Sequence, residues 1–413
     1  MTEAALPASS TNATKVTTAF SVVLLLGALN AMGPLSIDMY LPALPALQRD
    51  FGAGASAAQL TLSACLIGLA LGQVIMGPLS DRFGRRIPLL VGIAGFAIVS
   101  LACAIAPSIY LLILLRFMQG LTGSAGIVIA RAIVRDLYSG VAAARFFSML
   151  MLVTGTAPIL APIFGGQLLH FVDWQGIFII IGLTGVILFI AAATRFEETL
   201  PVSRRQTGGL GEMIHVFKRL LGDRVFVGYA LGGGIAYGTI FSYIAGSTFV
   251  LQDIYGLSAQ QYSLVFAVNS IGLVANGQLN GRFLIGRVPM TSLMTIGILG
   301  LMLGSGLFLI AVATGSGLWF ILPALFLIPS SMGMIIPNAM ALGMSRHPQT
   351  AGSSAALMGV LQYAIGAVLA PIVGLFGEDT AYPMAILMIV AATTALAAYF
   401  FLARRGTGLV LEG

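Results

Sequence analysis

Long apolar runs separated by short polar gaps fill the chain between residues 18 and 403. A helix needs about 20 apolar residues to cross the hydrocarbon core of a bilayer, which is roughly 30 Å thick. The pattern of runs and gaps predicts twelve transmembrane helices. They are expected at residues 18–46, 56–79, 88–106, 108–137, 143–171, 174–195, 225–252, 260–281, 290–313, 317–344, 351–376 and 381–403.

The stretch 196–224 is more polar than its surroundings and divides the helices into two sets of six. This pattern predicts an all-α membrane protein built from two six-helix bundles. Within the polar stretch, Glu212–Arg219 is expected to form a short surface helix. The predicted segments are an N-terminal tail at 1–17, a first bundle at 18–195, a linker at 196–224, a second bundle at 225–403 and a C-terminal tail at 404–413.

Similar motifs recur in the two halves of the chain. Residues 160–165 read LAPIFG in the fifth predicted helix, and residues 369–374 read LAPIVG in the eleventh. Internal repeats of this kind are typical of transporters, which bind their substrate near the midplane between the repeats. The repeat therefore favours a transporter over a membrane-embedded enzyme or an assembly factor.

The distribution of charge supports a membrane protein and predicts its orientation. Only 8% of the residues are charged, whereas soluble domains carry about 25%. Of the 20 lysine and arginine residues, seventeen fall on the side of the predicted helices that holds both termini and the linker, and Arg49 alone falls on the other. Basic residues collect in cytoplasmic loops. We therefore expect a multi-pass inner-membrane protein with both termini in the cytoplasm, and not a nucleic-acid-binding protein.

Patterns typical of catalysis do not occur in the sequence. The three histidines stand apart, no metal-ligand spacing is present, and neither Cys65 nor Cys103 lies in a zinc-binding pattern. A phosphate-binding glycine-rich loop is also missing. We expect a protein that is not an enzyme, holds no metal or cofactor and drives transport with an ion gradient.

The gap after the second predicted helix carries a dense motif of glycine and charge, with Gly84 placed for a tight turn. Asp81 can pair with a cation there or cap a helix N-terminus. We interpret the motif as an inner latch between the two bundles, and the alternative is a basic loop that only sets topology. Its residues, with two charges at the end of the fourth helix, are Gly77, Asp81, Arg82, Gly84, Arg85, Arg86, Arg135 and Asp136.

This loop resembles the signature between helices 2 and 3 of the major facilitator superfamily. Arg116 and Gln119, followed by a glycine, resemble the second signature of that superfamily in helix 4. Helix 5 is similar to the signature of drug antiporters, although Ala161 stands where that pattern usually has glycine. The matching positions in helix 5 are Gly155, Pro162, Gly165 and Gly166.

The segment Ser36–Pro45, which reads SIDMYLPALP, resembles the hallmark of the Bcr/CflA drug-efflux family. The resemblance implies the major facilitator fold and a proton-driven antiporter that exports antibiotics such as bicyclomycin or chloramphenicol-type compounds. The alternative on the same fold is an importer or facilitator of a small metabolite. The expected partners are a small drug-like molecule, protons and the lipid bilayer, and the protein is expected to be a monomer.

Two charges lie inside predicted helices at similar depth, Asp38 in the first and Arg116 in the fourth. Buried charges in membrane helices are costly and are kept for pairing or for function. We predict that the two form the proton-coupling site, with Asp38 as the carrier, and the alternative is a purely structural ion pair. Polar and aromatic residues at mid-helix depth that could line a substrate cavity are Tyr40, Gln119, Tyr237, Tyr243, Asn269, Asn338, Gln362 and Tyr363.

Overall fold

The computed structural model describes residues 12–138, 156–205, 210–375 and 380–404, and these residues are almost entirely helical. The first bundle contains the helical residues 156–168 and seven further elements. These are α1 (Asn12–Asp38), the short 3₁₀ helix η1 (Leu41–Ala43), α2 (Leu44–Phe51), α3 (Ala55–Phe83), α4 (Arg86–Ala104), α5 (Ile109–Leu137) and α7 (Trp174–Arg195).

A connecting segment with η2 (Val202–Arg204) and α8 (Leu210–Gly222) leads into the second bundle. The formation of α8 confirms the surface helix predicted within the linker. The second bundle contains α9 (Arg224–Phe249), the π-turn η3 (Val250–Ile254), α10 (Ala259–Leu279), the π-turn η4 (Asn280–Leu284), α11 (Met290–Ala313), α12 (Leu318–Ser345), η5 (Pro348–Thr350), α13 (Ala351–Leu375), α14 (Tyr382–Ala398) and η6 (Tyr399–Arg404).

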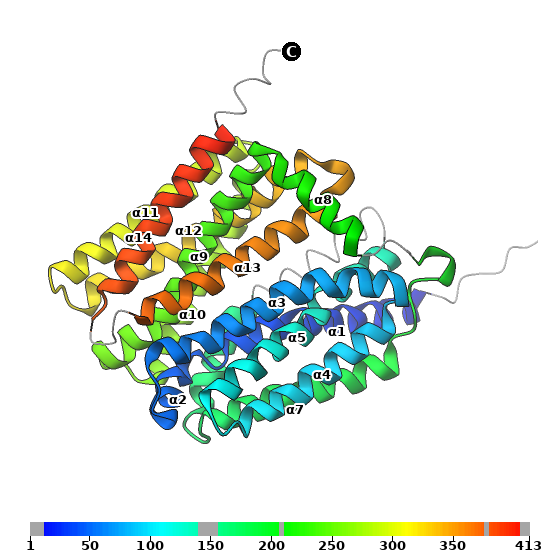
Figure 1. Ribbon diagram of the computed structural model, residues 1–413, viewed down its shortest axis with the longest axis horizontal. Helices are drawn as coiled ribbons and strands as arrows, with labels where there is room; N and C mark the ends of the chain where they lie inside the picture. Colours follow the sequence, from blue (N-terminus) through cyan, green and yellow to red (C-terminus); the bar gives the residue numbers. More distant parts are fainter. Residues whose placement is uncertain (1–11, 139–155, 206–209, 376–379, 405–413) are drawn as a thin grey trace, which may run out of the picture.

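Ten helices within the described ranges are long and apolar enough to cross a membrane. The more polar α10 and the helical residues 156–168 occupy the places of the eighth and fifth predicted helices, in keeping with the twelve-helix fold. The first part of the predicted helix 143–171, including Gly155, lies outside the described residues. Figure 1 shows the two bundles side by side, with α3 of the first packed against α13 of the second.

The first predicted helix, 18–46, is wrong in one respect, because the structure interrupts it after Asp38. Helix α1 ends there, and η1 and α2 continue the path to Phe51. Proline has no N–H to donate, and its ring clashes with the carbonyl four residues earlier. Pro42 therefore ends the hydrogen-bond ladder at Asp38, and Pro45 begins α2. The break places the Asp38 carboxyl at a helix end inside the protein instead of along a continuous helix.

The two ends of the bundles differ in their inter-bundle hydrogen bonds. The α2 end, where α2 and the α9–α10 connection lie, holds most of those made by the described residues. At the opposite end, called here the α8 end, lie α8 and the α3–α4 loop. In Figure 1 the axes of the bundles are inclined to each other and spread toward the α8 end. The described structure is thus tied together mainly at the α2 end.

Candidate translocation site between the bundles

Asp38 lies at the junction of the two bundles and is 5% exposed. Its carboxylate is within electrostatic range of the hydroxyl groups of Tyr237, Tyr243, Tyr262 and Tyr363, all from the second bundle. Tyr262 was not among the residues predicted from sequence. Four tyrosines of the second bundle therefore lie near this carboxyl group.

Arg116 is fully buried inside the first bundle, and it does not form the ion pair with Asp38 that the sequence suggested. Its Nη1 donates to the carbonyl oxygen of Ser36 over 2.9 Å and also to the Gln119 side-chain oxygen. Its guanidinium carbon lies 4.4 Å from the centroid of the Tyr40 ring. The pair does not form because these groups hold Arg116 within the first bundle while Asp38 faces the second.

Tyr40 and Gln119, two of the predicted substrate contacts, complete the surroundings of Arg116 inside the first bundle. Both are fully buried. The Tyr40 hydroxyl lies 2.7 Å from Thr61 Oγ1, and the Gln119 amide donates to Ser100 Oγ over 2.7 Å. A buried polar network of this kind restricts the arrangement of the helices around it, and within the described residues the Nε and Nη2 atoms of Arg116 have no hydrogen-bond partner.

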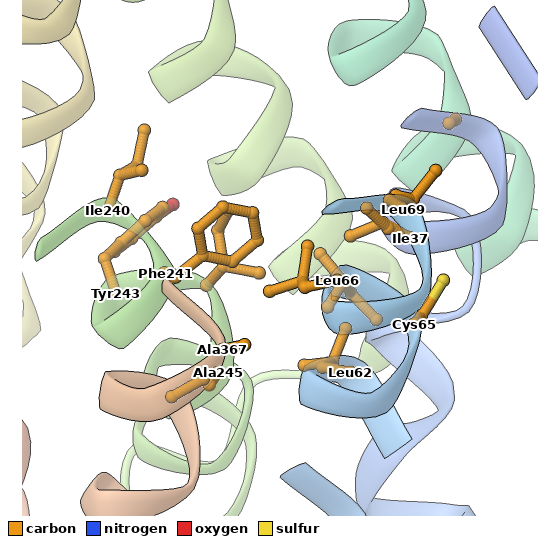
Figure 2. Packing of buried hydrophobic residues seen from close by; sticks show 14 of the residues in the cluster. Ile37, Leu62, Cys65, Leu66, Leu69, Ile240, Phe241, Tyr243, Ala245 and Ala367 are labelled. Atoms are coloured by element: carbon orange, nitrogen blue, oxygen red, sulfur yellow. The ribbon is translucent and has the colours of Figure 1, made fainter. Parts of the chain in front are cut away.

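The second bundle contributes two polar aromatic pairs near Asp38. The Asn269 amide donates to the Tyr243 hydroxyl over 2.7 Å. Tyr237 and Tyr363 meet edge to face, with ring centroids 5.9 Å apart. Figure 2 shows Leu62 and Leu66 of α3 facing α9 across the same junction. These two pairs are the predicted substrate contacts that the structure does bring to the junction.

The remaining two predicted substrate contacts lie elsewhere. The Asn338 amide donates to the Asn280 side-chain oxygen over 3.0 Å, which joins α12 to η4 within the second bundle toward the α8 end. Gln362 is 7% exposed, and its backbone lies beside Gly234 of α9. Asn338 is therefore bound within the second bundle in this structure, and its role as a substrate contact stays a prediction.

The break in helix 1 also closes the α2 end. At the break, the carbonyl groups of Leu41 and Pro42 accept hydrogen bonds from Thr248 (3.0 Å) and Gln252 (3.2 Å) of the second bundle. An exposed ion pair of 3.3 Å follows at the rim of the same region, between Arg49 and Asp253. Helix-terminal carbonyls need partners when they are buried, so the break supplies the acceptors for this closure.

The helix 5 motif packs into the same closed end. A Cβ atom at Gly165 would collide with the backbone carbonyl of Met39, next to Asp38. A Cβ atom at Gly166 would collide with the Ser263 hydroxyl of α10, and the Gly166 carbonyl accepts from Gln260 over 2.9 Å. Pro162 is buried one turn earlier. The two glycines thus let the fifth helix approach both the α1 break and the second bundle.

The α3–α4 loop forms a compact charge cluster at the α8 end. Arg85 donates to Asp81 (2.5 Å), to Asp136 (2.8 Å) and to Ser80 (2.8 Å). Burial alone would lower the pKa of Arg85, but the hydrogen bonds and charges of Asp136 and Asp81 raise it above its ordinary value. These contacts join the loop to the end of α5.

Glu198, which was not predicted from sequence, completes this cluster from the segment after α7. It accepts from the backbone N–H groups of Arg85 (2.7 Å) and Arg86 (3.3 Å). Burial alone would raise the pKa of Glu198, but these N–H groups, that of Leu200 and the charge of Arg205 lower it below its ordinary value. A Cβ at Gly84, whose φ is +91°, would collide with the Glu198 carboxylate, so the turn requires glycine.

Most contacts of the loop cluster among the described residues lie within the first bundle and the segment that follows it, and the latch between the bundles stays a prediction. Arg86 donates to the carbonyl of Ala193 over 2.9 Å, Arg82 lies over the Phe83 ring, and Gly77 packs near Val128. Arg135 alone approaches the second bundle, near Gly352.

Two bundles of membrane helices, with a buried carboxyl group at their junction and closure at one end, define a secondary transporter. A family model described as Major Facilitator Superfamily matches residues 24–371. The chain belongs to the major facilitator superfamily, within its Bcr/CflA-like drug-efflux members. It is a transporter and not an enzyme.

Relatives along the whole chain include transporters and resistance proteins. The chain is 40% identical to "Uncharacterized MFS-type transporter YdgK" of Bacillus subtilis, over 94% of this chain and 96% of that one. It is 30% identical to "Bicyclomycin resistance protein homolog" of Haemophilus influenzae, over 94% and 97%. "Multidrug resistance protein D" of Escherichia coli is 28% identical over 89% and 92%.

Solved structures support the same fold. A bacterial homologue of the human lysosomal transporter Spinster, in an inward-facing and unoccupied conformation, superposes with a TM-score of 0.73 at 15% identity, covering 96% of this chain and 98% of that one. A D-xylose–proton symporter superposes with a TM-score of 0.72 at 17% identity, covering 91% and 97%. At these identities the likeness concerns the fold alone.

Proposed function

We propose that this protein exports small drug-like molecules in exchange for protons, by alternating access between its two bundles. The observation that carries the proposal is the position of Asp38, a buried carboxyl group at the junction whose neighbours from the second bundle are tyrosines. A carboxyl group that is buried without a fixed cation can change protonation when its surroundings change. Substrate and proton would then compete for the same junction.

The conformation suits the loading step of such a cycle. Closure at the α2 end and spreading toward the α8 end would admit a substrate from the α8 side. The excess of basic residues in the loops at the α8 end supports a cytoplasmic location for that side by the positive-inside rule. Reporter fusions at residues 208 and 255 test this orientation, and the same sidedness at both positions would overturn it.

The relatives support drug-like substrates. One is a bicyclomycin resistance protein homologue, and another, from Pseudomonas aeruginosa, is a chloramphenicol resistance protein that is 30% identical over 91% of this chain and 89% of that one. The tyrosine pairs near Asp38 offer aromatic faces and hydroxyl groups, which bind aromatic and polar molecules without demanding one shape. Antibiotics of these two chemical types are therefore the first substrates to test.

The test is a drug-susceptibility panel in a host that lacks its own efflux pumps, with and without this chain. We expect higher tolerance to at least one antibiotic of these types, together with lower cellular accumulation that a protonophore abolishes. Improved growth on a single nutrient without any change in tolerance would instead indicate a metabolite importer. Export that survives the protonophore would contradict proton coupling.

A further inference from the structure

Arg131 is a second charge within the membrane-spanning part of α5, and it stands apart from the loop cluster. The nearby Asp136 accepts from Arg85 and from Thr199, which occupy the carboxylate. Within the described ranges, Arg131 has no hydrogen bond or ion pair, yet its side chain is exposed. Its neighbours Ala130 and Ala132 are buried. The exposed charge therefore emerges alone from a packed stretch of helix.

The direction of Arg131 follows from helix geometry. Residues seven or eleven apart lie within about 20° of each other around an α-helix. Arg131 therefore lies on the same side of α5 as Gly120 and Ser124, both of which pack against α3. The exposed apolar residues Leu111 and Met118 lie on roughly the opposite side. The guanidinium group therefore points toward the interior and not toward lipid.

The second bundle supplies the neighbour of Arg131. Its charge acts on the Tyr363 hydroxyl of α13, and Tyr363 meets Tyr237 edge to face. One turn along α13, Gly359 packs near the Gln73 side-chain oxygen of α3. Arg131 thus stands on the α8 side of the tyrosines that face Asp38. Tyr363 is within electrostatic range of both Arg131 and Asp38.

A guanidinium group held inside a membrane protein without an anion is costly unless water or a ligand reaches it. Its planar set of donors matches a carboxylate, which it can bind with two parallel hydrogen bonds. Tyr363, the neighbour on which its charge acts, is neutral. An exposed and unpaired arginine on the path of a substrate is therefore suited to binding an anion from that substrate.

We propose that Arg131 is a specificity residue that binds the carboxylate of anionic or zwitterionic aromatic substrates as they enter from the α8 end. The proposal rests on the proposed export function and names a substrate class for it. Tyr363 and Tyr237 would contact the aromatic part of the substrate beyond Arg131. An inside-negative membrane potential favours the exit of an anion, so export of this class agrees with the driving force.

The test uses dansylglycine and dansylglycinamide, a fluorescent pair that differs only in a carboxylate against a neutral amide. Binding to the purified full chain is followed by the increase in dansyl fluorescence. We expect the wild type to bind the acid about tenfold more tightly than the amide. In Arg131→Gln the two affinities should become equal, because binding of the acid alone is weakened. Arg131→Lys should keep part of the preference for the acid. Arg287→Gln, which removes an exposed charge from the loop before α11, should leave the ratio unchanged.

Equal affinity of the wild type for the two probes, or an unchanged ratio in Arg131→Gln, would overturn the proposal. If Arg131→Gln lost affinity equally for both probes, Arg131 would have a structural role only. That result would also overturn the proposal. The export function is judged separately, by drug tolerance and accumulation. If the wild type exports antibiotics but shows no preference for the acid, the proposed export function stands and the proposed substrate class fails.

Discussion

The guanidinium carbon of Arg116 lies 4.4 Å from the centroid of the Tyr40 ring, so an aromatic face neighbours this buried cation where a carboxylate was expected. Cation–π contacts stabilise by about 2 kcal/mol when they are desolvated. Arg116 is therefore held inside the first bundle independently of the protonation of Asp38. Asp38 can therefore gain or lose a proton without releasing Arg116 from its place inside the first bundle.

Substitutions at Tyr40 should separate the ring from the hydroxyl group. Tyr40→Phe keeps the ring over Arg116 and loses only the hydrogen bond to Thr61, for a loss of about 1 kcal/mol of stability. Tyr40→Leu also removes the aromatic face and should cost about 3 kcal/mol in total. Thermal unfolding in detergent measures both. Equal effects of the two variants would show that the ring does not stabilise Arg116.

The Glu198 carboxylate should make stability depend on acidity. The pKa of Glu198 is lowered in the folded protein. Its contribution to the free energy of unfolding is therefore fully present above the unfolded pKa of about 4.3. This contribution is lost as the pH falls through the lower pKa of the folded state. Glu198→Gln should therefore melt at a lower temperature than the wild type at pH 7. The gap between their melting temperatures should shrink below about pH 4. A gap that grows on acidification would contradict this account of the loop cluster.

Gly165 should tolerate no side chain, because a Cβ atom there meets the backbone carbonyl of Met39 and backbone cannot move aside cheaply. Gly165→Ala should displace the end of α1 and reduce transport at least tenfold at equal membrane expression. Gly306→Ala in α11 is the matched control, since the nearest atom to its Cβ would be 4.0 Å away. Full transport by Gly165→Ala would show that this contact is not maintained during the cycle.

The closure of the α2 end should depend on the side chains of Thr248 and Gln252. Replacing both, as Thr248→Val with Gln252→Leu, removes the donors to Leu41 and Pro42 while keeping similar volumes. Each lost hydrogen bond contributes about 1 kcal/mol, so the population open at the α2 end should rise about tenfold or more. Spin labels at the exposed positions 54 and 254 report the opening as a longer distance. An unchanged distance distribution would place the gate elsewhere.

Much of the fold was predictable because hydrophobic run length fixes the number of crossings. The break at Asp38 was missed although Pro42 and Pro45 were visible, because the run remains apolar through both prolines and hides the interruption. The surface helix α8 was found because its charges separate it from the membrane runs. The length and polarity of a helix are local properties, so they can be predicted from a single sequence.

Contacts between helices were harder to predict, and Asp38 with Arg116 is the clearest case. Position along a helix gives the depth of a residue, but the direction of its side chain depends on how neighbouring helices are rotated and packed. Asn338 illustrates the same limit, since its partner Asn280 is distant in sequence. Glu198 was missed because it follows a helix as an ordinary loop acid, and only the folded loop reveals its N–H partners.

Asp38→Asn in sealed proteoliposomes tests the central claim most directly. An imposed pH gradient drives uptake of a transported antibiotic, and binding is measured on the same protein in detergent. We predict that Asp38→Asn binds the drug but shows no gradient-driven accumulation, because asparagine cannot release a proton. Asp173→Asn, at an exposed position before α7, should behave as the wild type. Full gradient-driven accumulation by Asp38→Asn would contradict the assignment of Asp38 as the proton carrier.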